Sequence, residues 1–167
     1  VDLSASQRIK EKIKEVAKKT YGGNVVGGVG GFGAMYKLGD YRSPILVSST
    51  DPVGTKLMVA TMANNYSNIG ADLVNACVND LIVIGADPLF FLDYVATSSM
   101  DPEVVETIVS GISKSCHNVS CALIGGETSE MPGVFAGNNI DCSGFVVGVV
   151  EEDEMLRPLD AIQSGDT

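Results

Sequence analysis

The sequence contains no tryptophan, only 6% aromatic residues and a single histidine, His117. Its four cysteines, Cys77, Cys116, Cys121 and Cys142, form no C-x-x-C pair. This spacing excludes a zinc knuckle and a dense disulfide framework, so we expect buried thiols in a reducing compartment. One histidine beside one cysteine offers too few ligands for a metal site, and we interpret His117 as a residue at a helix end.

Positive charge is scarce, because 11 Lys and Arg residues face 21 Asp and Glu residues and the formal net charge is −10. An acidic surface repels phosphate backbones, which argues against nucleic-acid binding. A small anionic ligand would need metal ions or local backbone dipoles. No apolar run is long enough to span a membrane, and charges at Arg8, Lys10, Glu11 and Lys12 exclude a signal-peptide pattern. We expect a cytoplasmic protein that binds neither nucleic acid nor a membrane.

The chain is long enough for one domain with its own core. It has 167 residues, of which 45% are hydrophobic and 19% charged. We therefore treat residues 1–167 as a single domain. The last residues, 164–167, resemble the approach to another strand, so we expect a piece of a longer protein.

Helical and strand patterns alternate along the chain. Apolar periodicity predicts helices over residues 4–20, 56–66, 69–84 and 101–116. Aliphatic and aromatic runs predict strands over residues 45–50, 89–95, 121–124 and 143–150. A glycine-rich loop, residues 24–36, separates the first helix from the first strand. The alternation predicts a mixed α/β sheet domain and leaves the strand directions open.

Three acids lie at or near the ends of apolar elements. Asp51 ends a predicted strand, Asp80 lies in a predicted helix, and Glu127 follows a short strand and two glycines. Carboxylates at element ends can converge on one edge of a sheet, where they would suit Mg²⁺ and substrate phosphates. The alternative is that each acid caps a helix or lies in a solvated loop.

The helix predicted over residues 69–84 carries a polar stripe, with Asp72, Asn75 and Asn79 on one side. Its other residues are apolar nearly all round, which predicts a mainly buried helix. Buried amides and acids need partners, so we expect this stripe to face other polar groups or a ligand.

The glycine loop meets a loose G-x-G-x-x-G test over residues 27–33 but neither follows a predicted strand nor opens a helix. A dinucleotide-binding fold is therefore disfavoured, and no Walker loop is present. A flexible cover over phosphates and a plain hinge both remain open.

Five segments together resemble a known family. They are GGVGGFGA (27–34), SSTDPVGTKL (48–57), DLVNACVNDL (72–81), GADPLFFLDY (85–94) and GGETSEMPG (125–133). In this order they resemble the N-terminal domain of the aminoimidazole ribonucleotide synthetases, the phosphoribosylformylglycinamidine cyclo-ligases. The resemblance runs over nearly the whole chain.

The resemblance implies an α+β fold with a mixed sheet flanked by helices, which pairs with the sheet of a second subunit to form a barrel. A homodimer is therefore expected, with the ATP site at or beside the subunit contact. The implied reaction is ATP-dependent ring closure of formylglycinamidine ribonucleotide in purine biosynthesis. ATP phosphorylates the formyl amide oxygen, a nitrogen attacks that carbon, and phosphate leaves.

The resemblance also implies roles for individual residues. Asp51, Asp80 and Glu127 are the expected catalytic acids and ligands of Mg²⁺ and phosphate. Lys14 resembles a phosphate-contacting lysine of the family. Four nearby lysines are rivals for that role: Lys10, Lys12, Lys18 and Lys19.

Small residues supply the other implied nucleotide contacts. These are Gly30, Gly31 and Gly33 in the loop, and Gly126 and Thr128 beside the glutamate. Asp93 is expected near the substrate.

The sequence departs from the family at two places. Pro52 stands where glycine is usual, and Ser48-Ser49 replaces the usual Ser-Gly. Because proline has no N–H, phosphate affinity falls if that amide contacts the nucleotide. The family's C-terminal domain is also missing, so we expect these residues alone to be inactive.

Two alternatives remain. The first is another ATP-dependent member of the superfamily, although selenophosphate synthetase is disfavoured because the first cysteine is Cys77. The second is a non-catalytic dimerisation module, which retention of the three acids disfavours.

Overall fold

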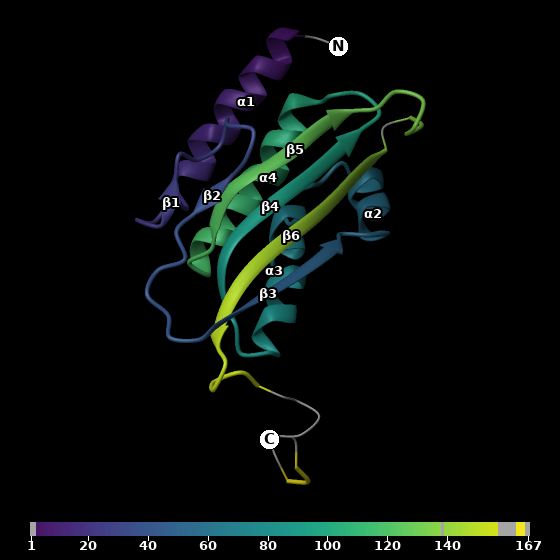
Figure 1. Ribbon diagram of the computed structural model, residues 1–167. Helices are drawn as coiled ribbons and strands as arrows, with labels where there is room; N and C mark the ends of the chain where they lie inside the picture. Colours follow the sequence, from purple (N-terminus) through teal and green to yellow (C-terminus); the bar gives the residue numbers. More distant parts are fainter. Residues whose placement is uncertain (1–2, 138, 157–162, 166–167) are drawn as a thin grey trace.

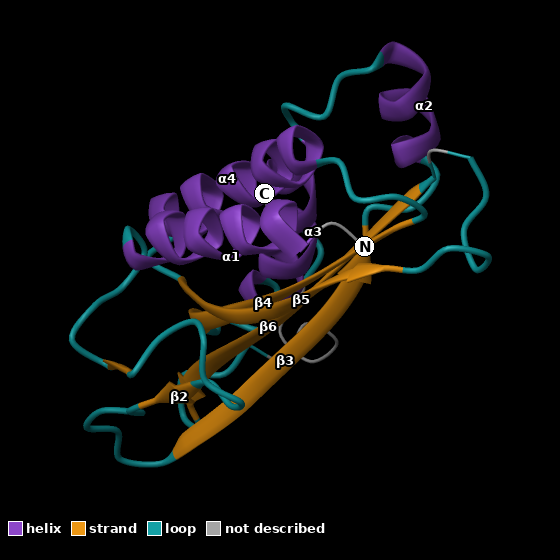
Figure 2. Cartoon of the chain, turned by 90° about the horizontal axis from the view of Figure 1, so that it is seen from above, coloured by secondary structure: helices purple, strands orange, loops and turns teal. Residues whose placement is uncertain are grey.

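The computed structural model describes residues 3–137, 139–156 and 163–165, and shows a main sheet with three helices stacked on a single face and a fourth near its end (Figure 2). Four helices are described: α1 (Leu3–Lys18), α2 (Lys56–Ala63), α3 (Ile69–Ile82) and α4 (Pro102–Asn118). The main sheet contains β3 (Pro44–Pro52), β4 (Asp87–Thr97), β5 (Ala122–Glu130) and β6 (Ile140–Glu151). Two short strands, β1 (Val25–Val26) and β2 (Met35–Tyr36), pair with each other. Among the described residues, no helix is long and apolar enough to cross a membrane.

The strand order of the main sheet is β3-β6-β4-β5 (Figure 1). Strand β6 is antiparallel to both β3 and β4, and β4 is parallel to β5. Three strands therefore run in one direction and end at the same side of the molecule. One row of paired residues, near the end of β3 and in the middle of β4 and β5, crosses the sheet, with Asp51, Gly144, Asp93 and Gly126 opposite one another in turn.

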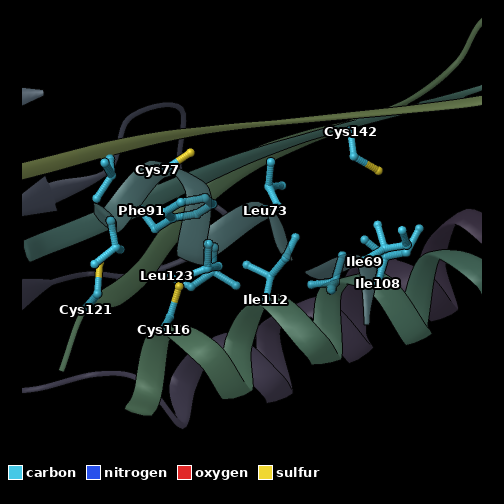
Figure 3. Packing of buried hydrophobic residues seen from close by; sticks show 14 of the residues in the cluster. Ile69, Leu73, Cys77, Phe91, Ile108, Ile112, Cys116, Cys121, Leu123 and Cys142 are labelled. Carbon is cyan, nitrogen blue, oxygen red and sulfur yellow. The ribbon is translucent and has the colours of Figure 1, made fainter. Parts of the chain in front are cut away.

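The core lies between the sheet and the helices. Figure 3 shows Phe91 in the middle of this layer, with Ile112 and Cys116 pointing into it from α4. Phe91, Leu73 and Ile112 are fully buried. Helices α3 and α4 approach closely at Gly70, where an added Cβ would overlap the backbone of α4. Glycine at this point lets the two helices bury their apolar faces together.

No helix of the described residues covers the second face of the sheet (Figure 2). The β1–β2 hairpin lies beside its β5 side (Figures 1 and 2), where the ring centroids of Tyr36 and Phe90 are 5.6 Å apart. Elsewhere apolar side chains face solvent, including Leu46, 61% exposed, and Phe145, 39% exposed. The sheet does not close within one chain, so the expected two-subunit barrel stays a prediction.

The predicted elements are confirmed, with differences at their ends. All four helices and four strands exist, and the four cysteines are free and buried, as expected. His117 lies in the last turn of α4, where its Nδ1 is 3.0 Å from the Lys19 carbonyl oxygen. The expectation of a further strand near residues 164–167 falls partly outside the described residues.

Two expectations are wrong. Glu127 does not follow β5 but lies within it, because the strand continues through Gly125 and Gly126. Helix α3 is not buried all round: one face packs on the sheet, while Asn75 and Asn79 are exposed. The apolar residues on its outer side, such as Ile82, face solvent as well.

Candidate functional site

A cleft of about 590 Å³ lies between α1, the glycine loop and β5. Its lining combines lysines from α1, loop backbone, and acids from β4 and β5. The lining residues are Ile9, Lys10, Ile13, Lys14, Val29, Gly30, Gly31, Asp93, Met100, Gly126, Glu127, Thr128 and Glu130. Seven of the residues expected to bind nucleotide or substrate are therefore gathered at one place, and Gly33 is not among them.

The α1 lysines divide into two groups. Lys10 and Lys14, one turn apart, line the cleft. Lys12 Nζ is 3.3 Å from Glu106 and 3.4 Å from Glu15, and Lys19 also pairs with Glu15. These acids raise the pKa of Lys12. The structure thus places Lys14 in the cleft and two of its rivals, Lys12 and Lys19, in ion pairs. Lys10, which the resemblance did not select, also lines the cleft.

The glycine loop is shaped around two side chains. Gly30 has a φ of 120°, and a Cβ there would lie 2.8 Å from Lys14 Cε, so the lysine packs against bare backbone. Gly28 leaves similar room for the Tyr21 ring, and the Tyr21 hydroxyl accepts a 2.8 Å hydrogen bond from Val29 N. The loop therefore holds the Lys14 side chain against the wall of the cleft.

Asp93 lies at the base of the cleft and is 6% exposed. Its carboxyl group occupies the space beside Gly126, where any Cβ would overlap it. Burial raises the pKa of Asp93 to about 7, and the charge of Glu127 adds to the rise. The cleft thus contains a carboxyl group that changes charge near neutral pH.

Glu127 and Thr128 are neighbours on β5 with different surroundings. Glu127 is exposed and lies opposite Tyr94, and its carboxylate accepts a 3.1 Å hydrogen bond from Ser129 Oγ. Thr128 lies opposite Val95 and is half-buried. Alternation along the strand therefore turns the two side chains in opposite directions.

Asp51 lies on β3, at the other edge of the sheet, and Asp80 lies on α3, which packs beside that strand. The Asp80 carboxylate accepts a hydrogen bond from Ser49 Oγ, which links α3 to β3. Cys77 Sγ lies 4.0 Å from the Asp51 carbonyl oxygen, and burial raises the pKa of this thiol to about 11. Ser49, one of the departures from the family, thus fixes the orientation of Asp80.

The two groups of acids are separate within one chain. Strands β3 and β5 form opposite edges of the sheet, about 14 Å apart at ordinary strand spacing. The Phe91 ring covers Gly144, between Asp51 and Asp93 in the same row. Within the part of the chain that is described, no three acidic, histidine or cysteine side chains are placed to hold a metal ion. Within these residues the three acids expected to hold Mg²⁺ are not gathered at one point, and the magnesium site stays a prediction.

The cleft also contains Met100 and Glu130, which the sequence did not single out, and Lys10, which it offered only as a rival of Lys14. Glu130 accepts a 2.9 Å hydrogen bond from Met100 N and so fixes the end of β4. The helical spacing of Lys10 and Lys14 was the available signal, but periodicity alone does not show which side of α1 faces a ligand.

The sequence profile of the family described as AIR synthase related protein, N-terminal domain, matches residues 33–150. The chain belongs to this family. The match covers the sheet, α2, α3 and α4, and leaves α1 and most of the glycine loop outside it.

Solved structures share the fold of this AIR synthase related domain. Thiamine-monophosphate kinase from Stenotrophomonas maltophilia is 20% identical, with a TM-score of 0.67 over 94% of this chain and 45% of that one. Escherichia coli HypE, a hydrogenase maturation protein, is 18% identical, with a TM-score of 0.69 over 96% of this chain and 48% of that one. HypE in complex with ATP has a TM-score of 0.67 at 18% identity, over 91% of this chain and 42% of that one. The chain thus spans less than half the length of these proteins.

Proposed function

We propose that this AIR synthase related domain binds ATP and, within a longer protein, serves the ring closure of formylglycinamidine ribonucleotide. The cleft carries the proposal, because it directs Lys10 and Lys14 and the backbone of a glycine loop toward one space in a chain of net charge −10. ATP as ligand is supported by relatives solved with ATP and with the analogue AMPPCP. The cyclo-ligase reaction rests on the five sequence segments.

In the proposed reaction, phosphorylation turns the formyl amide oxygen, a poor leaving group, into a good one. The formyl amide oxygen attacks the γ-phosphorus of ATP, the bond to the bridging oxygen breaks, and ADP leaves. The amidine-derived nitrogen then attacks the same carbon and loses its proton, and the phosphate departs with the former amide oxygen. Lys10 and Lys14 would neutralise phosphate charge while the loop backbone orients the γ-phosphate. Buried Asp93 would lie near the substrate.

We further propose that the acids of the two sheet edges meet in a homodimer. Both edges are free of strand partners within the described residues, and the helix-free face exposes Leu46 and Phe145. If the two sheets close a barrel with β3 of one chain against β5 of the other, Asp51 and Asp80 approach the partner's cleft. Such a shared site would give Mg²⁺ the carboxylates that one chain does not bring together.

Mixed dimers test this arrangement. In the full-length protein, Asp80→Asn and Glu127→Gln homodimers should each lose magnesium-dependent ATP binding and ring closure, while remaining dimeric. Mixing the two variants restores one intact site per dimer if the site is shared between chains. A mixed dimer as inactive as its parents would place both acids in one chain's site and contradict the shared site.

ATP binding itself is tested by calorimetric titration with and without Mg²⁺. Lys14→Ala should weaken binding about 10- to 100-fold, since a hydrogen bond to a charged group contributes about 1.5–3 kcal/mol. Lys12→Ala is the matched control, because Lys12 pairs with Glu15 and Glu106 outside the cleft. If Lys14→Ala and Lys12→Ala bind ATP equally well, the cleft is not the ATP site. If the wild type binds no ATP, a non-catalytic dimerisation module is favoured.

A second candidate is phosphoryl transfer to thiamine monophosphate, favoured by the likeness to thiamine-monophosphate kinase over 94% of the chain. Full-length protein assayed with both substrates separates the candidates. Phosphorylation of thiamine monophosphate without ring closure would replace the proposed reaction and leave the ATP site unchanged.

A further inference from the structure

The glycine loop presents an aromatic side chain to solvent. Every residue from 27 to 33 is glycine except Val29 and Phe32. Val29 is half-buried and packs against the core, whereas Phe32 is fully exposed. The removal of a phenylalanine ring from water is favourable, so a ligand that covers Phe32 gains binding free energy. Phe32 lies outside the residues that match the family, 33–150, and the proposed reaction gives it no role.

Phe32 directly follows the wall of the cleft described above. Gly30 and Gly31 line that cleft, where the connection between β1 and β2 lies beside α1 and β5 (Figure 1). Consecutive Cα atoms are about 3.8 Å apart, and a phenylalanine ring extends further than that from its own Cα. The ring is therefore within reach of a ligand that is held in the cleft.

Glycine on both sides lets the backbone reorient Phe32. Among the described residues, a Cβ at Gly33 would meet no atom within 4 Å, and one at Gly31 would meet only the Gly33 carbonyl oxygen, at 3.6 Å. The loop is held on either side of this segment, by the Tyr21 hydroxyl at Val29 N and by the pairing of β2 with β1. Rotation is thus confined to a short stretch of backbone beside the cleft.

The cleft also has an apolar wall. Ile13, Val29 and Met100 line it and are half-buried. Phosphates would contact Lys10 and Lys14, so these three side chains are available to an uncharged part of the ligand. The base of a nucleotide is planar, and its faces stack on aromatic rings. An apolar wall on one side and a phenylalanine on the other match the two faces of a base.

We propose that Phe32 is a base-stacking residue, which closes over the cleft when a nucleoside triphosphate binds there. This inference rests on the proposed binding of ATP in the cleft. In the closed arrangement the base lies between the Phe32 ring and the apolar wall, while the lysines hold the phosphates. Every base has a π-face, so this contact adds affinity for nucleotides in general and does not select adenine.

The test compares two ligands by calorimetric titration of the full-length protein with Mg²⁺: ATP, and inorganic triphosphate, which has no base. Phe32→Ala should weaken ATP binding about 5- to 100-fold, the range expected for the loss of one stacked base. Its affinity for triphosphate should equal that of the wild type. Phe32→Trp keeps an aromatic face and should bind ATP at least as tightly as the wild type. Met62→Ala, an exposed apolar residue of α2, is the matched control and should change neither affinity.

Lys14→Ala separates the failure of this inference from the failure of the ATP site, because it should weaken the binding of both ligands. If the wild type binds neither ligand, both proposals are wrong. If Lys14→Ala weakens both ligands and Phe32→Ala weakens neither, the cleft binds phosphates and the stacking alone is wrong. Equal losses of ATP and triphosphate affinity in Phe32→Ala would also overturn the stacking, since Phe32 would then act on the phosphates. Phe32→Trp as weak as Phe32→Ala would overturn it as well.

Discussion

The two edges of the sheet have acids in different surroundings, with Glu127 on β5 and Asp93 on the adjoining β4 at one edge, and Asp51 on β3 and Asp80 on α3 at the other. At the β5 edge, Asp93 and Glu127 border a cleft with two lysines, and Asp93 is almost completely buried. At the β3 edge, no ion pair of Asp51 or Asp80 is found among the described residues, and Lys56 Nζ pairs with Asp72 at 2.9 Å. Phosphate would be repelled by unscreened carboxylates and attracted by the lysines. Of the two edges as described, the β5 edge combines lysines with its acids, so we expect the proposed phosphate contacts there.

The largest expected effect is that of Phe91→Ala, at the core residue that lies between the two groups of acids. Phe91 is fully buried and its ring covers Gly144, between the two groups of acids. Loss of a buried phenylalanine costs about 3–5 kcal/mol of unfolding free energy through lost burial and the cavity that remains. Urea unfolding measures this loss. Phe32→Ala, an exposed residue of the glycine loop, is the control and should change stability by less than about 0.5 kcal/mol. Similar losses in both variants would show that Phe91 is not a core residue.

The second test concerns the buried acid at the β5 edge. The pKa of Asp93 is raised to about 7 in the folded chain, above the value of about 4 expected when unfolded. Between these values the folded state binds the extra proton, so stability falls as the pH rises from about 4 to about 7. Asp93→Asn should remove this fall, on the order of a few kcal/mol.

Urea midpoints across that pH range provide the measurement. Asp87→Asn, an exposed residue of the same strand, is the control and should keep the wild-type slope. A wild-type slope in Asp93→Asn would mean that burial does not hold the proton on Asp93. The contrast between buried Asp93 near the β5 edge and half-buried Asp51 and exposed Asp80 at the β3 edge would then lose its basis.

The third test asks how tightly β5 packs against β4. A Cβ at Gly126 would overlap both the backbone oxygen and the carboxyl group of Asp93. We expect Gly126→Ala to cost about 1–3 kcal/mol, as overpacking usually does. Gly31→Ala is the matched control, because its Cβ would meet only the Gly33 carbonyl oxygen at 3.6 Å. Equal unfolding midpoints for the two variants would show that the carboxyl group moves away without strain.

The sequence predicted the positions of most helices and strands well. It predicted poorly which residues strand pairing adds to an element and which helix faces are buried. Apolar runs located β3, β4 and β6, but β5 extends through six residues, 125–130, that have no apolar pattern. Their strand conformation comes from pairing with β4, a contact between distant parts of the chain. The α3 stripe was misjudged for a related reason, because outer apolar residues such as Ile82 made an exposed face resemble a buried one.

The candidate site was predictable only in part. Motif order selected Lys14, Asp93 and Glu127, which the fold brings to one cleft. It did not indicate that Asp51 and Asp80 lie across the sheet, since strand order depends on long-range pairing that periodicity does not encode.

The smallest expected effect is that of Pro52→Gly at the β3 edge. Pro52 is exposed at the end of β3, one residue after Asp51, and has no N–H to offer a phosphate. Glycine restores the donor but gives the unfolded chain more freedom, so stability should fall by about 0.4–1 kcal/mol. Magnesium-dependent ATP affinity of the full-length protein should rise if this edge joins the nucleotide site. Pro44→Gly, at the start of the same strand, controls for the stability loss alone and should leave ATP affinity unchanged. If the ATP affinity of Pro52→Gly is unchanged, the nucleotide does not contact the β3 edge at residue 52. Its contacts near the row that contains Asp51 would then lie at the β5 edge.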